Sequence, residues 1–128
     1  MLHRKASFFN SAAVAIFLTG CGSESPQPQV SYQATIKSIV DKNCTECHLE
    51  GGEGSSKSGF RTDSYDSLMK GTFYGPVVVP GNPLSSSFYR LVAGKVDPSI
   101  RMPHGKDPLS EAEISAIETW ITQGAKNN

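Results

Sequence analysis

Five consecutive residues constrain this chain more than any others: Cys44, Thr45, Glu46, Cys47 and His48. On a helical turn, residues i, i+3 and i+4 share one face, so two thiols and an imidazole can reach one flat ligand together. The pattern Cys-x-x-Cys-His is the attachment sequence for c-type haem. We therefore expect Cys44 and Cys47 to form thioethers with one porphyrin and His48 to bind its iron.

Three other uses of the two cysteines stay open. They could form a disulfide in a structural lipoprotein without haem, a thioredoxin-like redox pair, or half of a zinc site. The redox pair requires a βαβ context, which the sequence does not predict. A zinc site requires a second Cys or His pair at suitable spacing, which the sequence lacks. Haem attachment is the interpretation that the sequence favours.

The second axial ligand of the iron is predicted at Met102, which lies 54 residues after His48. Because Pro103 follows, the Met102 backbone is biased toward an extended conformation, so its side chain can project from a loop. His104 is the competing ligand, since imidazole also binds iron well, and an open or differently ligated position is the third possibility. Met69 is expected to pack in the core.

The axial ligands decide what the iron can do. A Met ligand raises the reduction potential relative to two imidazoles, and two filled axial positions keep oxygen and peroxide away. We expect one haem c in a carrier of single electrons that serves redox partner proteins and is not an enzyme. The alternative is a haem-based sensor or peroxidase-like enzyme with an open or His-ligated distal site. Arg61 and Arg101 are candidates to pair with haem propionates.

The N-terminus predicts export and lipidation. A short basic start precedes the apolar run 12–18, as in a signal peptide. The run is shorter than the roughly 20 apolar residues that span a membrane. Residues 18–21, Leu-Thr-Gly-Cys, resemble the lipobox of bacterial lipoproteins. We expect cleavage after residue 20 and acylation of Cys21 at a periplasm-facing membrane surface, inner or outer. An anchor helix and an ordinary signal peptide are the alternatives.

The rest of the chain predicts one tethered domain. Residues 21–30 hold two prolines and few apolar side chains, as in a flexible tether. Residues 31–128 are enough for one domain. Over the whole chain, twelve Lys and Arg side chains balance twelve Asp and Glu side chains. Nucleic acid is an unsuitable partner, because it binds to a concentrated positive surface.

Apolar side chains at helical spacing predict an all-α domain of about four helices. The helices expected are 32–42, 64–70 with Asp63 as N-cap, one that opens at Asn82 and Pro83 and ends before Gly94, and one from the capping box of Ser110 and Glu113 to Gly124. The glycine-rich residues 51–59 are expected to form a mobile surface loop, and residues 77–79 an extended segment. Long loops of this kind need an apolar surface to cover, and one covalently bound haem would supply it.

A spaced series of short stretches resembles the small domains called planctomycete-type cytochrome C. The matching stretches are 44–48, 59–65, 70–71, 79–83, 86–90, 101–103 and 108–125. The resemblance implies a class I-like cytochrome c fold in which the first and last helices pack together. It also implies that Met102 lies opposite His48.

Overall fold

The computed structural model describes residues 27–128. The predicted signal peptide, 1–20, and the predicted lipidation site Cys21 lie outside these residues. Pro28 and Val30 already contact the domain: the Val30 N–H donates to Gln123 Oε1 at 2.8 Å, and Gln123 Nε2 donates to the Pro28 carbonyl at 3.1 Å. Within the described residues, no helix is both long and apolar enough to cross a membrane.

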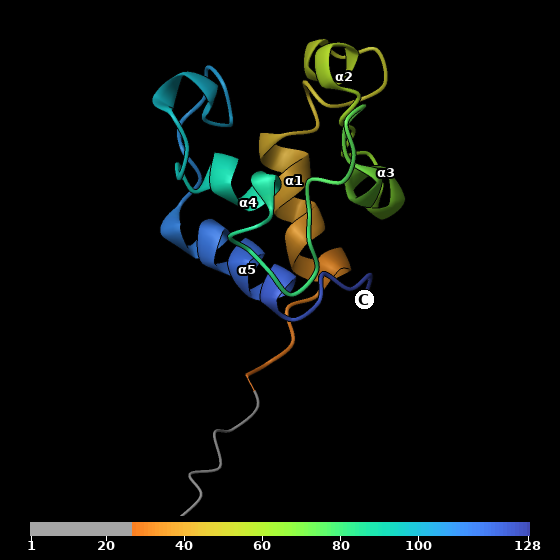
Figure 1. The fold of residues 1–128 in the computed structure, drawn as a ribbon. Helices are drawn as coiled ribbons and strands as arrows, with labels where there is room; N and C mark the ends of the chain where they lie inside the picture. The colour runs from red at the N-terminus through yellow and green to blue at the C-terminus, as the bar shows by residue number, and fades with distance from the viewer. Residues whose placement is uncertain (1–26) are drawn as a thin grey trace, which may run out of the picture.

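The described part of the chain is built from helices and loops (Figure 1). Its elements are the π-helical turn η1 (Tyr32–Ile36), α1 (Lys37–Asn43), α2 (Glu53–Ser58), α3 (Tyr65–Lys70), α4 (Ser87–Val92), the 3-10 turn η2 (Pro98–Ile100) and α5 (Glu111–Thr122). Over residues 27–128 the extended pairing is limited to one isolated bridge between Thr72 and Gly75. The all-α prediction is therefore confirmed for this part of the chain.

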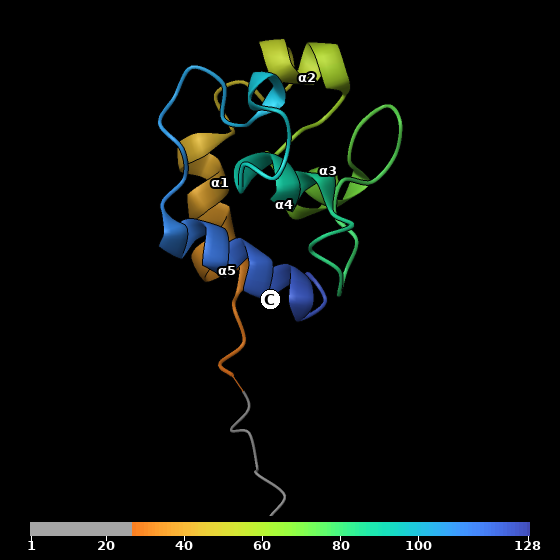
Figure 2. The ribbon, with the colours of Figure 1, turned by 60° about the vertical axis from the view of Figure 1, so that its left-hand side comes forward.

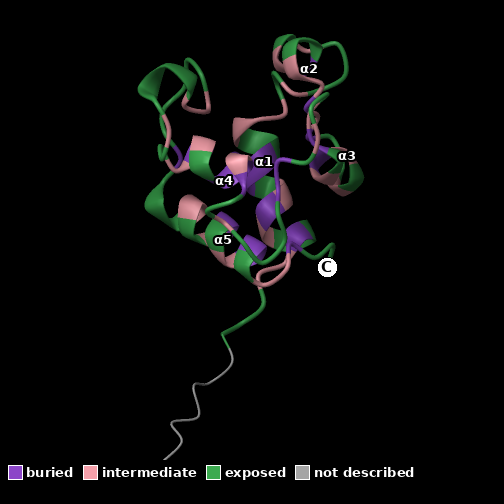
Figure 3. Ribbon diagram, in the orientation of Figure 1, coloured by how far each residue is buried: buried purple, intermediate pink, exposed green. Residues whose placement is uncertain are grey.

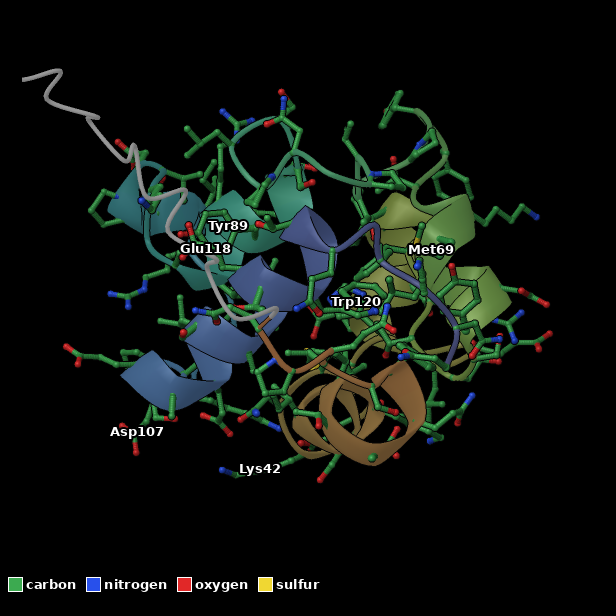
Figure 4. All side chains as sticks on the ribbon, turned by 90° about the horizontal axis from the view of Figure 1, so that it is seen from below. Lys42, Met69, Tyr89, Asp107, Glu118 and Trp120 are labelled. Carbon is green, nitrogen blue, oxygen red and sulfur yellow. The ribbon has the colours of Figure 1, made fainter. Side chains whose placement is uncertain are left out.

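The first helix, formed by η1 and α1 in continuation, packs against α5. The Tyr32 and Trp120 rings lie 5.8 Å apart, and Trp120 sits between the two helices (Figure 4). At the other end of the contact, Lys42 Nζ lies 3.0 Å from Glu113 Oε1. Figure 2 shows the two helices side by side from a second direction. This packing agrees with the expectation for the first and last helices.

The core lies where the first helix, α4 and α5 meet (Figure 3). The apolar stripes predicted for the first helix and α5 point into it. Their fully covered members are Tyr32, Ile36, Val40, Ile117, Trp120 and Ile121. From α4, Phe88, Tyr89 and Val92 complete this core, with Tyr89 beside Glu118 of α5 (Figure 4). Phe88 and Val92 also line the candidate site, so α4 connects the core with that site.

The α5 start is as predicted. Ser110 Oγ accepts the Glu113 N–H at 3.3 Å, while Glu113 Oε2 accepts the Ser110 N–H at 2.8 Å. This reciprocal pair is a capping box, which satisfies two N–H groups that a helix start would leave without partners. The helix ends at Thr122, and Gly124 adopts a positive φ of 98° just beyond it.

The prediction of a mobile loop over 51–59 is wrong, because Glu53–Ser58 form α2. Cys47 stabilises the start of this helix, since its carbonyl accepts the Gly54 N–H at 2.9 Å and the Ser55 N–H at 3.2 Å. An ion pair of 2.7 Å between Lys57 and Glu53 spans one turn. These contacts offset the weak helix preference of glycine.

Two predicted helix starts are also wrong. Asn82 and Pro83 belong to a turn in which Asn82 Oδ1 accepts the Ser85 N–H at 3.0 Å, and α4 begins only at Ser87. Leu84 is 65% exposed as a result. Ser64 in place of Asp63 caps α3, because the Asp63 carboxylate is bound by Arg61.

Candidate haem site

Cys44, Cys47 and His48 lie on one turn directly after α1. The Cys44 N–H donates to the Val40 carbonyl at 2.8 Å, so this cysteine ends the helix. The N–H groups of Cys47 and His48 then donate to the Cys44 carbonyl at 3.2 and 3.1 Å. These bonds between residues three and four positions apart hold the three side chains in the arrangement that their spacing predicts.

His48 is oriented by a main-chain carbonyl. Its Nδ1 lies 3.0 Å from the oxygen of Phe60. A carbonyl only accepts hydrogen bonds, so Nδ1 carries the proton, and Nε2 keeps the lone pair that a metal ligand needs. The Phe60 ring also packs edge-on against the imidazole, with ring centres 5.1 Å apart. Phe60 therefore fixes both the tautomer and the tilt of the ring.

Gly54 of α2 provides the space in which the imidazole lies. A Cβ atom at this position would come 2.7 Å from His48 Cε1 and 2.9 Å from Nε2. It would also lie 3.0 Å from the Cys47 carbonyl. Contacts this short are excluded, so any larger side chain at position 54 would displace the ring.

A cavity of about 450 Å³ opens beside this turn, within the range of small-molecule and cofactor sites. Its wall includes residues of α2, of α4 and of the segment that follows η2, and Figure 1 shows how these three segments are arranged. Apolar side chains form most of its wall: Phe60, Val77, Phe88, Leu91, Val92 and Met102. Cys44, Cys47 and His48 are also part of the wall. The cavity is apolar, and its wall holds two thiols and an imidazole whose Nε2 is available to a metal. These features fit a haem.

Met102 lines the cavity from a different segment of the chain than His48. Its N–H donates to the Leu91 carbonyl at 3.2 Å, which ties the loop to α4. The Met102 side chain is half-buried and packs against the core as well as lining the cavity. His104 also lines the cavity, although it is more exposed. Met69 instead packs against the core from α3 (Figure 4).

Burial changes the chemistry of one of the cysteines. Desolvation raises the pKa of Cys44 to about 11, against which the nearby Lys106 ammonium acts only partly. At neutral pH the Cys44 group is therefore a thiol and not a thiolate. Cys47 is exposed to solvent. The two cysteines of the attachment turn thus differ in their exposure to solvent.

The two arginines considered as propionate partners have different surroundings. The Arg61 guanidinium is already bound by Asp63 at 2.6 Å and by Glu50 at 3.3 Å. Arg101 packs over Gly94, and its Nε is buried without a hydrogen-bond partner among the described residues. Neither side chain forms part of the cavity wall.

Three residues of this site were not predicted from the sequence: Gly54, Phe60 and Lys106. Lys106 lines the cavity and binds Glu46, with Nζ 2.5 Å from Oε2. The Phe60 carbonyl contacts His48, which lies 12 positions earlier in the sequence. The Lys106 ammonium contacts Glu46, which lies 60 positions earlier. The one signal that could have identified Gly54 is a glycine inside a helix. Because this helix was not predicted, the signal could not be used.

A Cys-x-x-Cys-His turn at the wall of an apolar cavity is typical of a c-type cytochrome. Among residues 27–128 there is also no group of three or more His, Cys, Asp or Glu side chains suited to a bare metal ion. Residues 44–105 match the sequence model of the family described as planctomycete cytochrome C. The match supports the resemblance: residues 44–105 are similar to planctomycete-type cytochrome C domains, a family that implies haem c as the cofactor. No curated protein and no solved structure matches the chain.

Proposed function

We propose that this protein is a monohaem c-type cytochrome of class I-like fold that carries single electrons between redox partner proteins. The observation that supports this most strongly is the position of Met102 and His48 at the wall of one apolar cavity, on different segments. Cys44 and Cys47 would attach the haem, and His48 Nε2 and the Met102 thioether would be the axial ligands. When bound there, the haem supplies a one-electron iron couple.

The residues around the site suit electron transfer better than catalysis at the iron. Phe60 holds His48 in one orientation, and the apolar wall keeps water away from the ligands. A soft, neutral thioether favours ferrous iron, and Met102 bound to the iron would leave no place for oxygen or peroxide. A cytochrome C family domain fits an electron carrier better than an enzyme.

The optical spectrum of the oxidised protein tests the ligand set. We expect a sulfur-to-iron charge-transfer band in the far red, lost in Met102→Ala and retained in Met69→Ala. Met69 is the matched control, because it is the other methionine of the domain and packs in the core. A band that survives Met102→Ala, with a spectrum that changes in His104→Ala, would assign the ligand to His104. Ready binding of carbon monoxide at neutral pH would favour the sensor or peroxidase-like alternative.

We also propose that the domain, residues 31–128, is tethered by residues 21–30 to a lipid on Cys21 at a periplasm-facing membrane surface. Support comes from the lipobox-like sequence at 18–21. More than one acyl chain gives stable attachment, which a single chain does not. Mass spectrometry of the mature protein tests this: an N-terminal residue other than an acylated Cys21 would refute it. Redox partners would dock through a small interface, as transient redox complexes do.

A further inference from the structure

An ion pair joins the two segments that would supply the haem's attachment and its distal ligand. Lys106 Nζ lies 2.5 Å from Glu46 Oε2. Glu46 stands between the two cysteines of the attachment turn, and Lys106 follows Met102 by four positions. Lys106 also lines the cavity. The contact therefore crosses from one wall of the candidate haem site to the other.

The segment that carries this lysine has few other attachments. Its start is fixed where the Met102 N–H donates to Leu91, and its end is fixed by the buried side chain of Leu109. Within residues 27–128, the Lys106–Glu46 contact is the one hydrogen bond that links residues 103–109 to another segment. The middle of the loop is thus held at a single polar point.

Both partners respond to the contact. The Lys106 ammonium lowers the pKa of Glu46, and the Glu46 carboxylate raises the pKa of Lys106. Both groups are charged at neutral pH, so the pair persists there. An exposed pair in solvent contributes little to global stability, but a loop with one polar attachment depends on it more than the whole fold does.

We propose that Glu46 and Lys106 form a latch that keeps the Met102 loop closed over the haem cavity, and that Lys106 is a positioning residue for Met102. This rests on the proposed function, in which Met102 is the distal ligand. When the latch opens, the loop moves away more often, and a small external ligand competes with Met102 more successfully. Because the pair is exposed, we expect its effect to weaken at high salt.

The test measures how tightly imidazole binds to the oxidised protein, since imidazole must displace Met102. Lys106→Gln and Glu46→Gln should each raise the affinity for imidazole by about twofold to fivefold, the range of an exposed ion pair. The double variant Glu46→Lys with Lys106→Glu should return toward the wild-type affinity. The wild-type affinity should increase between ionic strengths of about 0.01 M and 1 M, where the Debye length falls from about 30 Å to 3 Å.

The chain offers a matched control in Lys57→Gln. Lys57 and Glu53 also line the cavity, and their ion pair of 2.7 Å is of the same kind, but both belong to α2. Loss of that pair removes an equal charge without releasing a loop, so the affinity for imidazole should stay within about 1.5-fold of wild type.

Two failures can be told apart. A wild-type protein without the far-red band refutes the proposed ligand set and the latch with it. A wild-type protein that has the band and loses it in Met102→Ala keeps the proposed function. In that protein, an imidazole affinity unchanged by Lys106→Gln, or raised equally by Lys57→Gln, overturns the latch alone.

Discussion

His48 is held by residues that are distant in sequence. The carbonyl of Phe60 binds its Nδ1, and the bare backbone of Gly54 leaves room for its ring. Glycine inside a helix ordinarily lowers stability by about 0.5–1 kcal/mol relative to alanine. At position 54 the missing side chain is what allows the helix and the imidazole to approach each other.

Gly54→Ala should therefore destabilise the protein, against the helix preference. The added Cβ would come 2.7 Å from His48 Cε1, and overpacking of this kind typically lowers stability by about 1–3 kcal/mol. Urea unfolding followed by Trp120 fluorescence measures the loss, and the Soret spectrum reports any displacement of His48. Ser56→Ala, at an exposed position of the same helix, is the control and should be neutral or slightly stabilising. An equal change in unfolding free energy in the two variants would show that His48 does not require the space left by the missing side chain of Gly54.

At the residue scale, the candidate haem ligands could be predicted from the sequence, but the residues that contact and orient them could not. Spacing alone groups Cys44, Cys47 and His48, because three and four positions make one turn. Met102 was predicted from the following proline, and it does line the cavity. Phe60 and Lys106 act through contacts between loops. No local pattern encodes such contacts, so only the folded chain identifies them.

At the element scale, α5 shows how a helix start can depend on pH. Glu113 accepts the Ser110 N–H and also binds Lys42 of the first helix. These contacts lower the pKa of Glu113 from its ordinary 4.5 to about 2, with the Ser110 backbone bond as the main cause. The folded state holds the charged form, so this carboxylate stabilises the fold fully above about pH 4.5. That contribution declines as the pH falls from 4.5 toward 2.

Glu113→Gln should cost about 1 kcal/mol of unfolding free energy near pH 7, because the neutral amide can still accept the Ser110 N–H but loses the charge that binds Lys42 and suits a helix start. The difference from wild type should shrink as the pH is lowered from about 4.5 and be small near pH 2, where about half of the wild-type Glu113 is protonated. Urea unfolding at several pH values measures it. Glu111→Gln, in the same first turn, is the control for loss of a negative charge. A difference independent of pH would mean that the charge of Glu113 contributes nothing.

The elements differ in how far their sequences reveal them. The first helix and α5 were predicted because each carries an apolar stripe and a clear start. Helix α2 was not, because its sequence is rich in glycine and serine, and its start is stabilised by the Cys47 carbonyl. The start of α4 was placed too early, because Asn82 and Pro83 occur equally well in the turn that Ser85 closes.

At the scale of the whole molecule, the cavity predicts that the fold depends on the proposed haem. Without a cofactor, the apolar wall of the cavity of about 450 Å³ is open to solvent, and each large apolar side chain left uncovered forgoes up to about 1.5–3 kcal/mol of burial energy. A few such side chains amount to a large share of the stability of a small domain, about 5–15 kcal/mol. The apolar walls from α4 and the loops thus belong to a core that the polypeptide does not fill alone.

Haem-free protein made with Cys44→Ser and Cys47→Ser should consequently lose its cooperative thermal transition or melt at least about 20 °C lower. Calorimetry and circular dichroism measure this, and single replacement of either cysteine, which leaves one thioether, provides the comparison. A sharp transition at the wild-type temperature in the double variant would show that the helices alone form the core. The long loops in the sequence already indicated this dependence on haem. The volume of the cavity could be obtained only from the structure.

The fold is complete only after the first helix has packed against α5, and this contact depends on a late part of the chain. Residues 111–122 follow Cys44 by more than sixty positions, and Tyr32 cannot reach Trp120 before they arrive. Contacts between such distant segments form late, because a long loop must close first. The attachment turn would therefore be accessible to an assembly enzyme while the chain is still open. In the proposed cytochrome, the order of the helices along the chain would leave time for the haem to be joined before the fold encloses it.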